Sequence, residues 1–126
     1  MPYVKDVMKK EIIVAKIHEP IQHISKLLTE KKISNIPVIN GRGGLIGVVS
    51  EQDIIRAMES EDFMKLTAKD IMTKTVLSVK ENDSLEYVSK VFMEHPFRRL
   101  PVTRNKKVVG TVTREDIINS FMSDYY

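Results

Sequence analysis

The sequence contains no cysteine, which excludes disulfide bonds, thiolate metal sites and cysteine nucleophiles. It also has no long hydrophobic run. The apolar runs are only a few residues long, as at 45–49, whereas a membrane-spanning helix needs roughly 20 apolar residues. Residues 1–6 lack the charged and then apolar order of a secretion signal. These absences predict a cytoplasmic protein that is not inserted in a membrane.

Sequence motifs of several enzyme classes are missing as well. Neither the Gly-x-Gly-x-x-Gly pattern nor a Gly-x4-Gly-Lys-Ser/Thr loop occurs, and we expect the glycine-rich segment 41–44 to be a hairpin turn. His18, His23 and His95 do not combine with carboxylates at a metal-ligand spacing, and the motif around Ser50 supplies no histidine partner for a nucleophile. We therefore expect no metal site, no cofactor and no catalytic activity.

The composition is ordinary for a compact soluble domain: 42% of the 126 residues are hydrophobic and 29% are charged. The formal net charge of +3 is too small to indicate a nucleic-acid partner by itself. It would still favour an anionic ligand if the positive side chains converged on a cleft.

An internal repeat is the most informative feature of the sequence. Four residues within 5–10 recur identically 64 positions later, within 69–74, and Pro37-Val38 recurs at 101–102 with the same offset. After a one-residue gap near Gly43 the offset becomes 63. We predict two tandem domains, residues 1–60 and 61–126. The identities at the second offset pair Gly47, Val49, Asp53, Ile54 and Ile55 with Gly110, Val112, Asp116, Ile117 and Ile118.

Each copy has the same predicted order of elements: strand, helix, strand, strand, helix, which is an α+β fold. The first strands are expected at 12–14 and 76–77, and turns after Ile39 and Val102 precede the last strands. A copy of about 55 residues buries little surface alone. We therefore expect a pseudo-twofold pair that shares one core and has two clefts. The expected buried helix stripes are Ile21, Ile24, Leu27 and Leu28, and Leu85, Val88, Val91 and Phe92.

The last strand of each copy leads into its final helix through a hydroxyl residue, Ser50 or Thr113, with Asp53 or Asp116 three positions later. This spacing is typical of a capping box, although a capping box prefers Glu or Gln where both copies have Asp. A short carboxylate at a helix start can also bind the two hydroxyls of a ribose, while neighbouring hydroxyl and N–H groups meet a phosphate. The two roles are compatible.

Two adjacent arginines, Arg98 and Arg99, precede a predicted buried strand of the second copy. They are either a solvated basic edge or a phosphate-binding pair, for which the planar guanidinium is well suited. The matching residues of the first copy, Ser34 and Asn35, carry no charge. We expect the two clefts to differ, with the arginine side taking the more anionic ligand.

Three motifs occur in register in both copies: Asp-Val-Met or Asp-Ile-Met, Ile-Pro-Val or Leu-Pro-Val, and Gly-Val-Val-Ser-x-x-Asp-Ile or Gly-Thr-Val-Thr-x-x-Asp-Ile. Together they resemble the cystathionine β-synthase (CBS) domain, and the likeness covers nearly the whole chain, twice. It implies a tandem CBS pair, or Bateman module, that binds adenosine-containing ligands in its clefts. By this resemblance Asp53 and Asp116 hold the ribose, and Ser50 and Thr113 lie beside it. The other ligand positions that it implies are Arg98, Arg99, Ser34, Thr75 and Val76.

The resemblance implies a regulatory ligand-sensing module whose ligand is AMP, ADP or ATP. Binding would favour one arrangement of the two copies over another. Because 126 residues leave no room for an effector domain, we expect the signal to pass to an effector protein in trans, and family modules commonly form homodimers. Two alternatives stay open: a ligand such as S-adenosylmethionine or methylthioadenosine, or a role as a protein or nucleic-acid adaptor.

Overall fold

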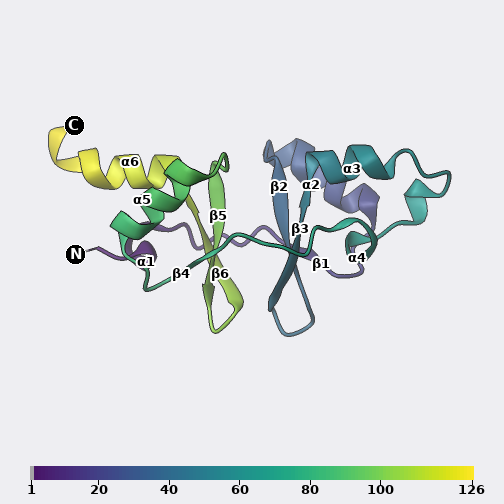
Figure 1. Cartoon of the computed structure of the whole chain (residues 1–126), viewed down its shortest axis with the longest axis horizontal. Coiled ribbons are helices and arrows are strands. Elements are labelled where there is room, and N and C mark those ends of the chain that lie inside the picture. The colour runs from purple at the N-terminus through teal and green to yellow at the C-terminus, as the bar shows by residue number, and fades with distance from the viewer. Residues whose placement is uncertain (1) are drawn as a thin grey trace. The chain divides into compact units, whose positions relative to one another are not determined.

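The computed structural model describes residues 2–126, which form two compact units (Figure 1). Unit 1 comprises the described residues up to Ile12 together with 77–126, and unit 2 comprises 13–76. The N-terminal segment of each sequence copy thus belongs to the unit of the other copy. The boundaries 1–60 and 61–126 refer to the copies and stay a prediction. No helix within 2–126 is long and apolar enough to cross a membrane.

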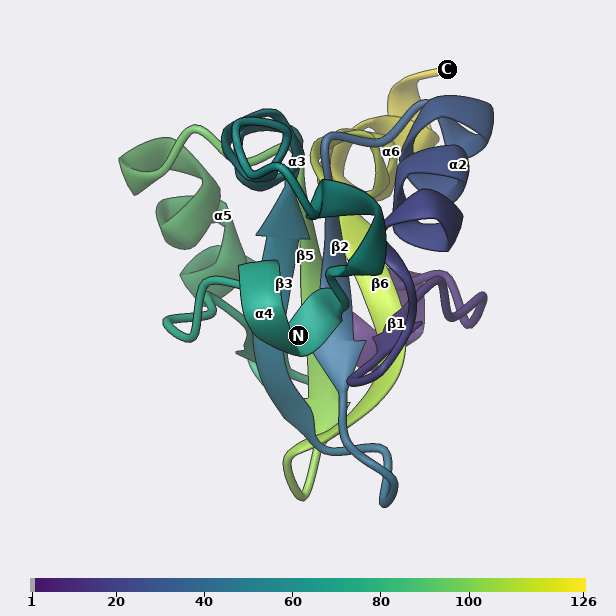
Figure 2. The ribbon, with the colours of Figure 1, turned by 90° about the vertical axis from the view of Figure 1, so that its right-hand side faces the viewer.

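Unit 2 contains a three-stranded sheet in the order β1-β2-β3, in which β1 is parallel and β3 antiparallel to β2. The β2–β3 connection is the predicted hairpin turn, closed where the Asn40 N–H donates to Gly44 O at 2.9 Å. Figure 2 looks onto this unit and shows the turn at the opposite end from α3. The elements are β1 (Ala15–Lys16), α2 (Ile21–Lys31), β2 (Asn35–Ile39), β3 (Leu45–Ser50), α3 (Glu51–Ala57), a 3-10 turn (Phe63–Lys65) and α4 (Ala68–Ile71).

Unit 1 repeats this arrangement with the sheet β4-β5-β6. Ser84 caps its first long helix by accepting the Tyr87 N–H at 3.1 Å. The α+β fold class is confirmed. The elements are α1 (Val4–Val7), β4 (Val79–Lys80), α5 (Leu85–Glu94), β5 (Arg99–Arg104), β6 (Lys107–Thr113), α6 (Arg114–Met122) and a 3-10 turn (Ser123–Tyr125).

Each unit has a hydrophobic cluster of its own. The core shared by the two copies, expected from the sequence, stays a prediction. The predicted helix stripes are buried, with Leu27 only half-buried. Val4 adds the N-terminal segment to the cluster of unit 1, and Ala68 adds α4 to that of unit 2. The N-terminal segments of the two copies, residues 2–12 and 61–76, are called the exchanged segments below. Each therefore contributes to the packing of the unit that receives it.

The first strand of each copy begins later than predicted. Residues 12–14 and 76–77 lie outside the strands, which occupy 15–16 and 79–80. Ile13 and Leu77 pack as partly buried side chains against the clusters of their units. Their apolar character therefore reflects side-chain packing and not membership of a β-ladder.

Two glycines explain why the Asp-x-Met and Gly motifs occur together in each copy. A Cβ on Gly110 would lie 2.6 Å from Lys9 O and 2.9 Å from Met8 Sδ. A Cβ on Gly47 would lie 2.5 Å from Met72 Sδ. Each glycine therefore leaves space for the methionine of the other copy's exchanged segment. A larger residue at either glycine would displace that methionine.

Candidate functional site

The start of α3 in unit 2 is formed by Ser50 and Asp53, which make the predicted capping box. Asp53 is only 4% exposed, and both carboxylate oxygens accept hydrogen bonds. Oδ2 accepts the Ser50 N–H at 2.8 Å and the Ser50 hydroxyl at 3.0 Å. Oδ1 accepts Arg56 Nη1 at 3.2 Å and the Thr73 hydroxyl at 3.3 Å. A ribose could bind this carboxylate only by displacing these donors.

The start of α6 in unit 1 has the same cap but a more accessible carboxylate. The Thr113 N–H donates to Asp116 Oδ2 at 2.9 Å, and the Asp116 N–H donates to the Thr113 hydroxyl at 3.1 Å. Asp116 Oδ1 accepts the Lys9 ammonium at 3.0 Å, its only donor among the described residues. The Lys9 side chain is 57% exposed. The Asp116 side chain is thus 10% exposed, against 4% for Asp53, and the single partner of its Oδ1 is an exposed ammonium.

Lys9 and Thr73 contact the two acids although no sequence motif singles them out. They are equivalent, 64 positions apart, and each directly follows the methionine of its copy. Lys9 forms two backbone hydrogen bonds with Thr111, at 2.8 and 2.9 Å, and Thr73 pairs in the same way with Val48, at 2.8 and 2.9 Å. These bridges place both side chains beside an acid. An alignment of the two copies could have revealed Lys9, because it carries a charge where the equivalent residue, Thr73, is neutral.

Arg98 and Arg99 lie beside the same helix start as Thr113. Arg99 is opposite Thr113 in the β5–β6 ladder, and Arg98 O accepts the Arg114 N–H at 3.1 Å. Arg98 Nη2 lies 3.2 Å from Glu115 Oε1, with both side chains mostly exposed. The N–H of Glu115 itself, and then the nearby Arg98 guanidinium, hold the pKa of the Glu115 carboxyl below its ordinary value. The second copy thus gathers positive charge where an anion could bind.

Arg114 fixes the loop that precedes these arginines, and sequence reasoning missed it. Its Nη2 donates to Phe92 O at 3.0 Å and to His95 O at 2.9 Å, and its Nε donates to Phe97 O at 2.8 Å. These bonds satisfy carbonyl groups at the end of α5 and hold the chain up to Arg98. The equivalent residue of the first copy is Glu51, which has no guanidinium to donate.

Three predicted ligand positions lie in unit 2, the unit of Asp53. Ser34 is exposed, and its carbonyl accepts the Glu51 N–H at 2.9 Å, so that it lies at the start of α3. Thr75 is exposed and Val76 is half-buried, just beyond the Thr73 bridge. The structure therefore groups Ser34, Thr75 and Val76 with the first copy's acid, and places Arg98 and Arg99 with the second copy's acid.

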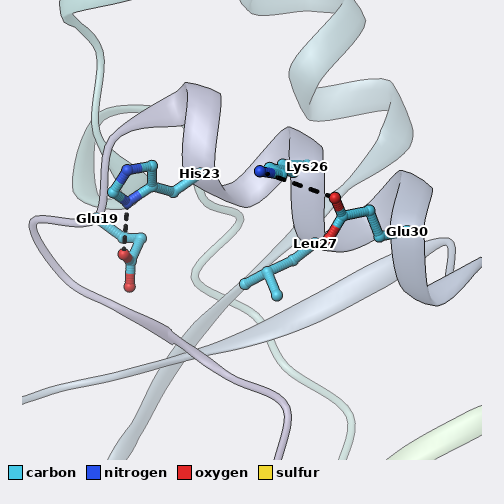
Figure 3. A pocket seen from close by; sticks show the side chains of 5 residues that line it. All are labelled: Glu19, His23, Lys26, Leu27 and Glu30. Carbon is cyan, nitrogen blue, oxygen red and sulfur yellow. Dashed lines mark hydrogen bonds and ion pairs between the residues drawn. The ribbon is translucent and has the colours of Figure 1, made fainter.

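A shallow cavity of about 270 Å³ lies along α2, and none of the predicted ligand residues lines it. Its charged side chains pair with one another: His23 Nδ1 is 3.1 Å from Glu19 Oε2, and Lys26 Nζ is 3.8 Å from Glu30 Oε1 (Figure 3). Leu27 completes the lining. Across residues 2–126, no group of three or more His, Asp or Glu side chains is placed to hold a metal ion.

Comparison with known families matches the CBS domain to residues 4–60 and again to residues 68–123. The chain belongs to the CBS domain family. The two matches cover most of the sequence, and they confirm the resemblance that the three repeated motifs indicated. Each CBS copy thus contributes one of the two equivalent helix starts, those of α3 and α6.

Related sequences include both short and long proteins. The uncharacterized protein MJ1426 of Methanocaldococcus jannaschii is 29% identical over 153 residues, which cover 94% of this CBS protein and 90% of its own length. Homoserine O-acetyltransferase of Methanosarcina acetivorans is 34% identical over 116 residues, which cover 90% of this chain but 21% of the enzyme. This chain therefore spans about a fifth of that enzyme.

Two solved CBS structures are similar over almost the whole chain, and both hold adenosine compounds. CBSX2 of Arabidopsis thaliana, in complex with AMP, has a TM-score of 0.85 and 28% identity, with 100% of both chains covered. The CBS domain pair of MJ0100, in complex with methylthioadenosine and S-adenosylmethionine, has a TM-score of 0.77 and 29% identity, with 98% of both chains covered. CBS pairs of this fold thus bind adenosine-containing ligands.

Proposed function

We propose that this CBS protein is a regulatory module that binds an adenine nucleotide at the start of α6 in unit 1. The observation that carries the proposal is the Asp116 carboxylate, whose Oδ1 is held only by an exposed ammonium among the described residues. The ribose hydroxyls would donate to this oxygen, as alcohols do to carboxylates at helix starts. Thr113 and the helix N–H groups would lie toward the phosphate.

Positive charge near Asp116 favours a phosphate-bearing ligand. Arg98 and Arg99 begin β5 beside Thr113, and their guanidinium groups are suited to bind phosphate oxygens in pairs. Arg99 forms no salt bridge within residues 2–126, and the Arg98 pair with Glu115 is exposed and exchangeable with solvent. AMP in CBSX2 supports the same ligand class for this chain.

A second candidate ligand has a specific observation in its favour. The CBS pair of MJ0100 holds methylthioadenosine and S-adenosylmethionine, and it is 29% identical to this chain. These compounds carry a ribose but no phosphate, so they would use Asp116 without needing Arg98 and Arg99. The start of α3 is the weaker candidate, because the Asp53 oxygens already have donors from Arg56 and Thr73.

Regulation would follow from differential binding. A ligand that prefers one conformation raises the population of that conformation by its difference in affinity. The output would be read by an effector protein in trans, with a homodimer as the sensing form. In this proposal the module binds its ligand without converting it.

Isothermal titration calorimetry against AMP, ADP, ATP, adenosine, S-adenosylmethionine and methylthioadenosine tests the proposal. We expect a phosphate-bearing nucleotide to bind most tightly and to stabilise the fold by about 2.7 kcal/mol at 100 times its Kd. Binding of S-adenosylmethionine or methylthioadenosine alone would replace the nucleotide with the second candidate. Binding of none of them, together with capture of nucleic acid that weakens steeply with salt, would favour the adaptor role and overturn the proposal.

A further inference from the structure

Lys9 reaches the start of α6 from the N-terminal segment, 107 residues from Asp116 in sequence. Its backbone is fixed by the two hydrogen bonds to Thr111. Its side chain is mostly exposed, with the ammonium 3.0 Å from Asp116 Oδ1. The residue therefore combines an anchored backbone with a charged group that is free to change partners, because four methylene groups separate the two.

The geometry points to Lys9 as a residue that determines ligand specificity at this site, an inference that rests on the proposed function. In the free protein the Lys9 ammonium neutralises Asp116. When ribose hydroxyls take its place at Oδ1, the ammonium transfers to a phosphate oxygen of the same ligand. Lys9 therefore selects a ligand that carries both a ribose and a phosphate.

The selection follows from what the displaced ammonium gains. Adenosine displaces Lys9 from Asp116 and offers it no anionic partner, whereas AMP offers a phosphate that forms a charge-assisted hydrogen bond. Since the side chain is exposed, screening by solvent keeps the effect moderate. We expect Lys9 to raise the ratio of AMP affinity to adenosine affinity by roughly three- to tenfold.

Unit 2 provides the contrast. Thr73 occupies the equivalent place beside Asp53 and donates a neutral hydroxyl at 3.3 Å. A hydroxyl has no charge to transfer to a phosphate. Lys9→Thr therefore gives unit 1 the residue that unit 2 has at this one position and leaves Thr113 and Asp116 intact.

Calorimetric titrations of AMP and of adenosine into the full chain test this inference. The proteins are the wild type, Lys9→Thr, Lys9→Arg and Lys10→Thr. Lys10→Thr is the matched control, because Lys10 is the next residue, is exposed and carries the same charge. In Lys9→Thr the ratio of AMP affinity to adenosine affinity should fall by roughly three- to tenfold, whereas Lys9→Arg and Lys10→Thr should keep it within about twofold. Thermal unfolding checks that each variant is folded.

The outcomes separate this inference from the proposed function. If the wild type binds both ligands and Lys9→Thr keeps their ratio, Lys9 does not set specificity, although the proposed function stands. An equal loss for AMP and adenosine assigns Lys9 a purely structural role and also overturns the inference. If the wild type binds neither AMP nor adenosine, the inference fails, and titration of ADP, ATP, S-adenosylmethionine and methylthioadenosine then decides the proposed function separately.

Discussion

The starts of α3 and α6 have the same cap and different neighbours. In both, a hydroxyl residue accepts the N–H of an aspartate three positions on, and the aspartate accepts a backbone N–H in return. Around Asp53 the remaining oxygen has two donors from unit 2, the Arg56 guanidinium, which is 70% exposed, and the Thr73 hydroxyl. Around Asp116 the corresponding oxygen meets the exposed ammonium of Lys9. The comparison teaches that one copy of a repeat can surround its carboxylate with several donors while the other leaves one oxygen to a single exposed ammonium.

The largest expected effect concerns the two glycines under the exchanged segments. Gly110→Ala should lower the free energy of unfolding by about 2–3 kcal/mol, because its Cβ would meet the backbone carbonyl of Lys9 at 2.6 Å. Gly47→Ala should cost about 1 kcal/mol less, because its nearest contact is the flexible side chain of Met72. Urea denaturation of both variants measures the difference. A larger loss for Gly47→Ala would show that the two segments pack differently from the structure.

The next effect separates the two acids by stability. Asp53→Ala removes the acceptor for Ser50 and Thr73 at a position that is 4% exposed, together with the exposed Arg56 pair, and should cost about 2 kcal/mol. Asp116→Ala loses the same cap but releases only an exposed ammonium, and should cost about 1 kcal/mol. Chemical denaturation of the two variants, without ligand, gives the comparison directly. Equal losses would mean that the extra donors around Asp53 contribute nothing.

A smaller effect concerns the arginines that distinguish the second copy. Arg98→Ala with Arg99→Ala should weaken AMP or ATP binding by about tenfold or more. Each lost charge-assisted hydrogen bond costs about 1.5–3 kcal/mol, and solvent screening reduces this cost at exposed side chains. Adenosine has no phosphate, so its binding should change by less than about twofold. The matched control is Lys106→Ala with Lys107→Ala, which removes the same charge from the exposed β5–β6 turn. Titration calorimetry measures both. If the control loses as much affinity as the arginine variant, the effect is one of net charge.

The smallest effect is on the pH dependence of stability in unit 2. The Thr67 backbone N–H, and then its hydroxyl, hold the pKa of Asp70 below its ordinary value of 3.8. The resulting stabilisation is complete above that value and is lost as the pH falls through the lower folded value. Asp70→Asn should therefore lose less stability than the wild type between about pH 5 and about pH 2. Urea midpoints at both pH values test this, and identical losses would contradict the assignment.

Much of the fold could be predicted because the same local sequence patterns occur in both copies. The apolar stripes around Ile24 and Val88, the hairpin at 40–44 and the two capping boxes follow from local spacing, and the structure agrees with them. The exchange of the N-terminal segments could not be predicted in this way. It depends on the contacts of Met8 with Gly110 and of Met72 with Gly47, which join residues far apart in the chain.

The candidate site was predicted in part. The spacing of Thr113 and Asp116 predicts the helix start, and the charge of Arg98 and Arg99 distinguishes the two copies in the sequence. Lys9 was missed because its importance depends on a bridge to Thr111 across the whole chain. Arg114 was missed because a guanidinium that binds three carbonyl groups leaves no mark in the sequence beyond its charge.

The contrast between the two acids is tested most directly by titrating AMP into the wild type, Asp53→Ala and Asp116→Ala, each confirmed as folded by circular dichroism. We predict that Asp116→Ala weakens AMP binding by at least about tenfold, whereas folded Asp53→Ala binds within about threefold of the wild type. Loss of binding in Asp53→Ala with retention in Asp116→Ala would contradict the account, because the ligand would then occupy the carboxylate that we assign to structure.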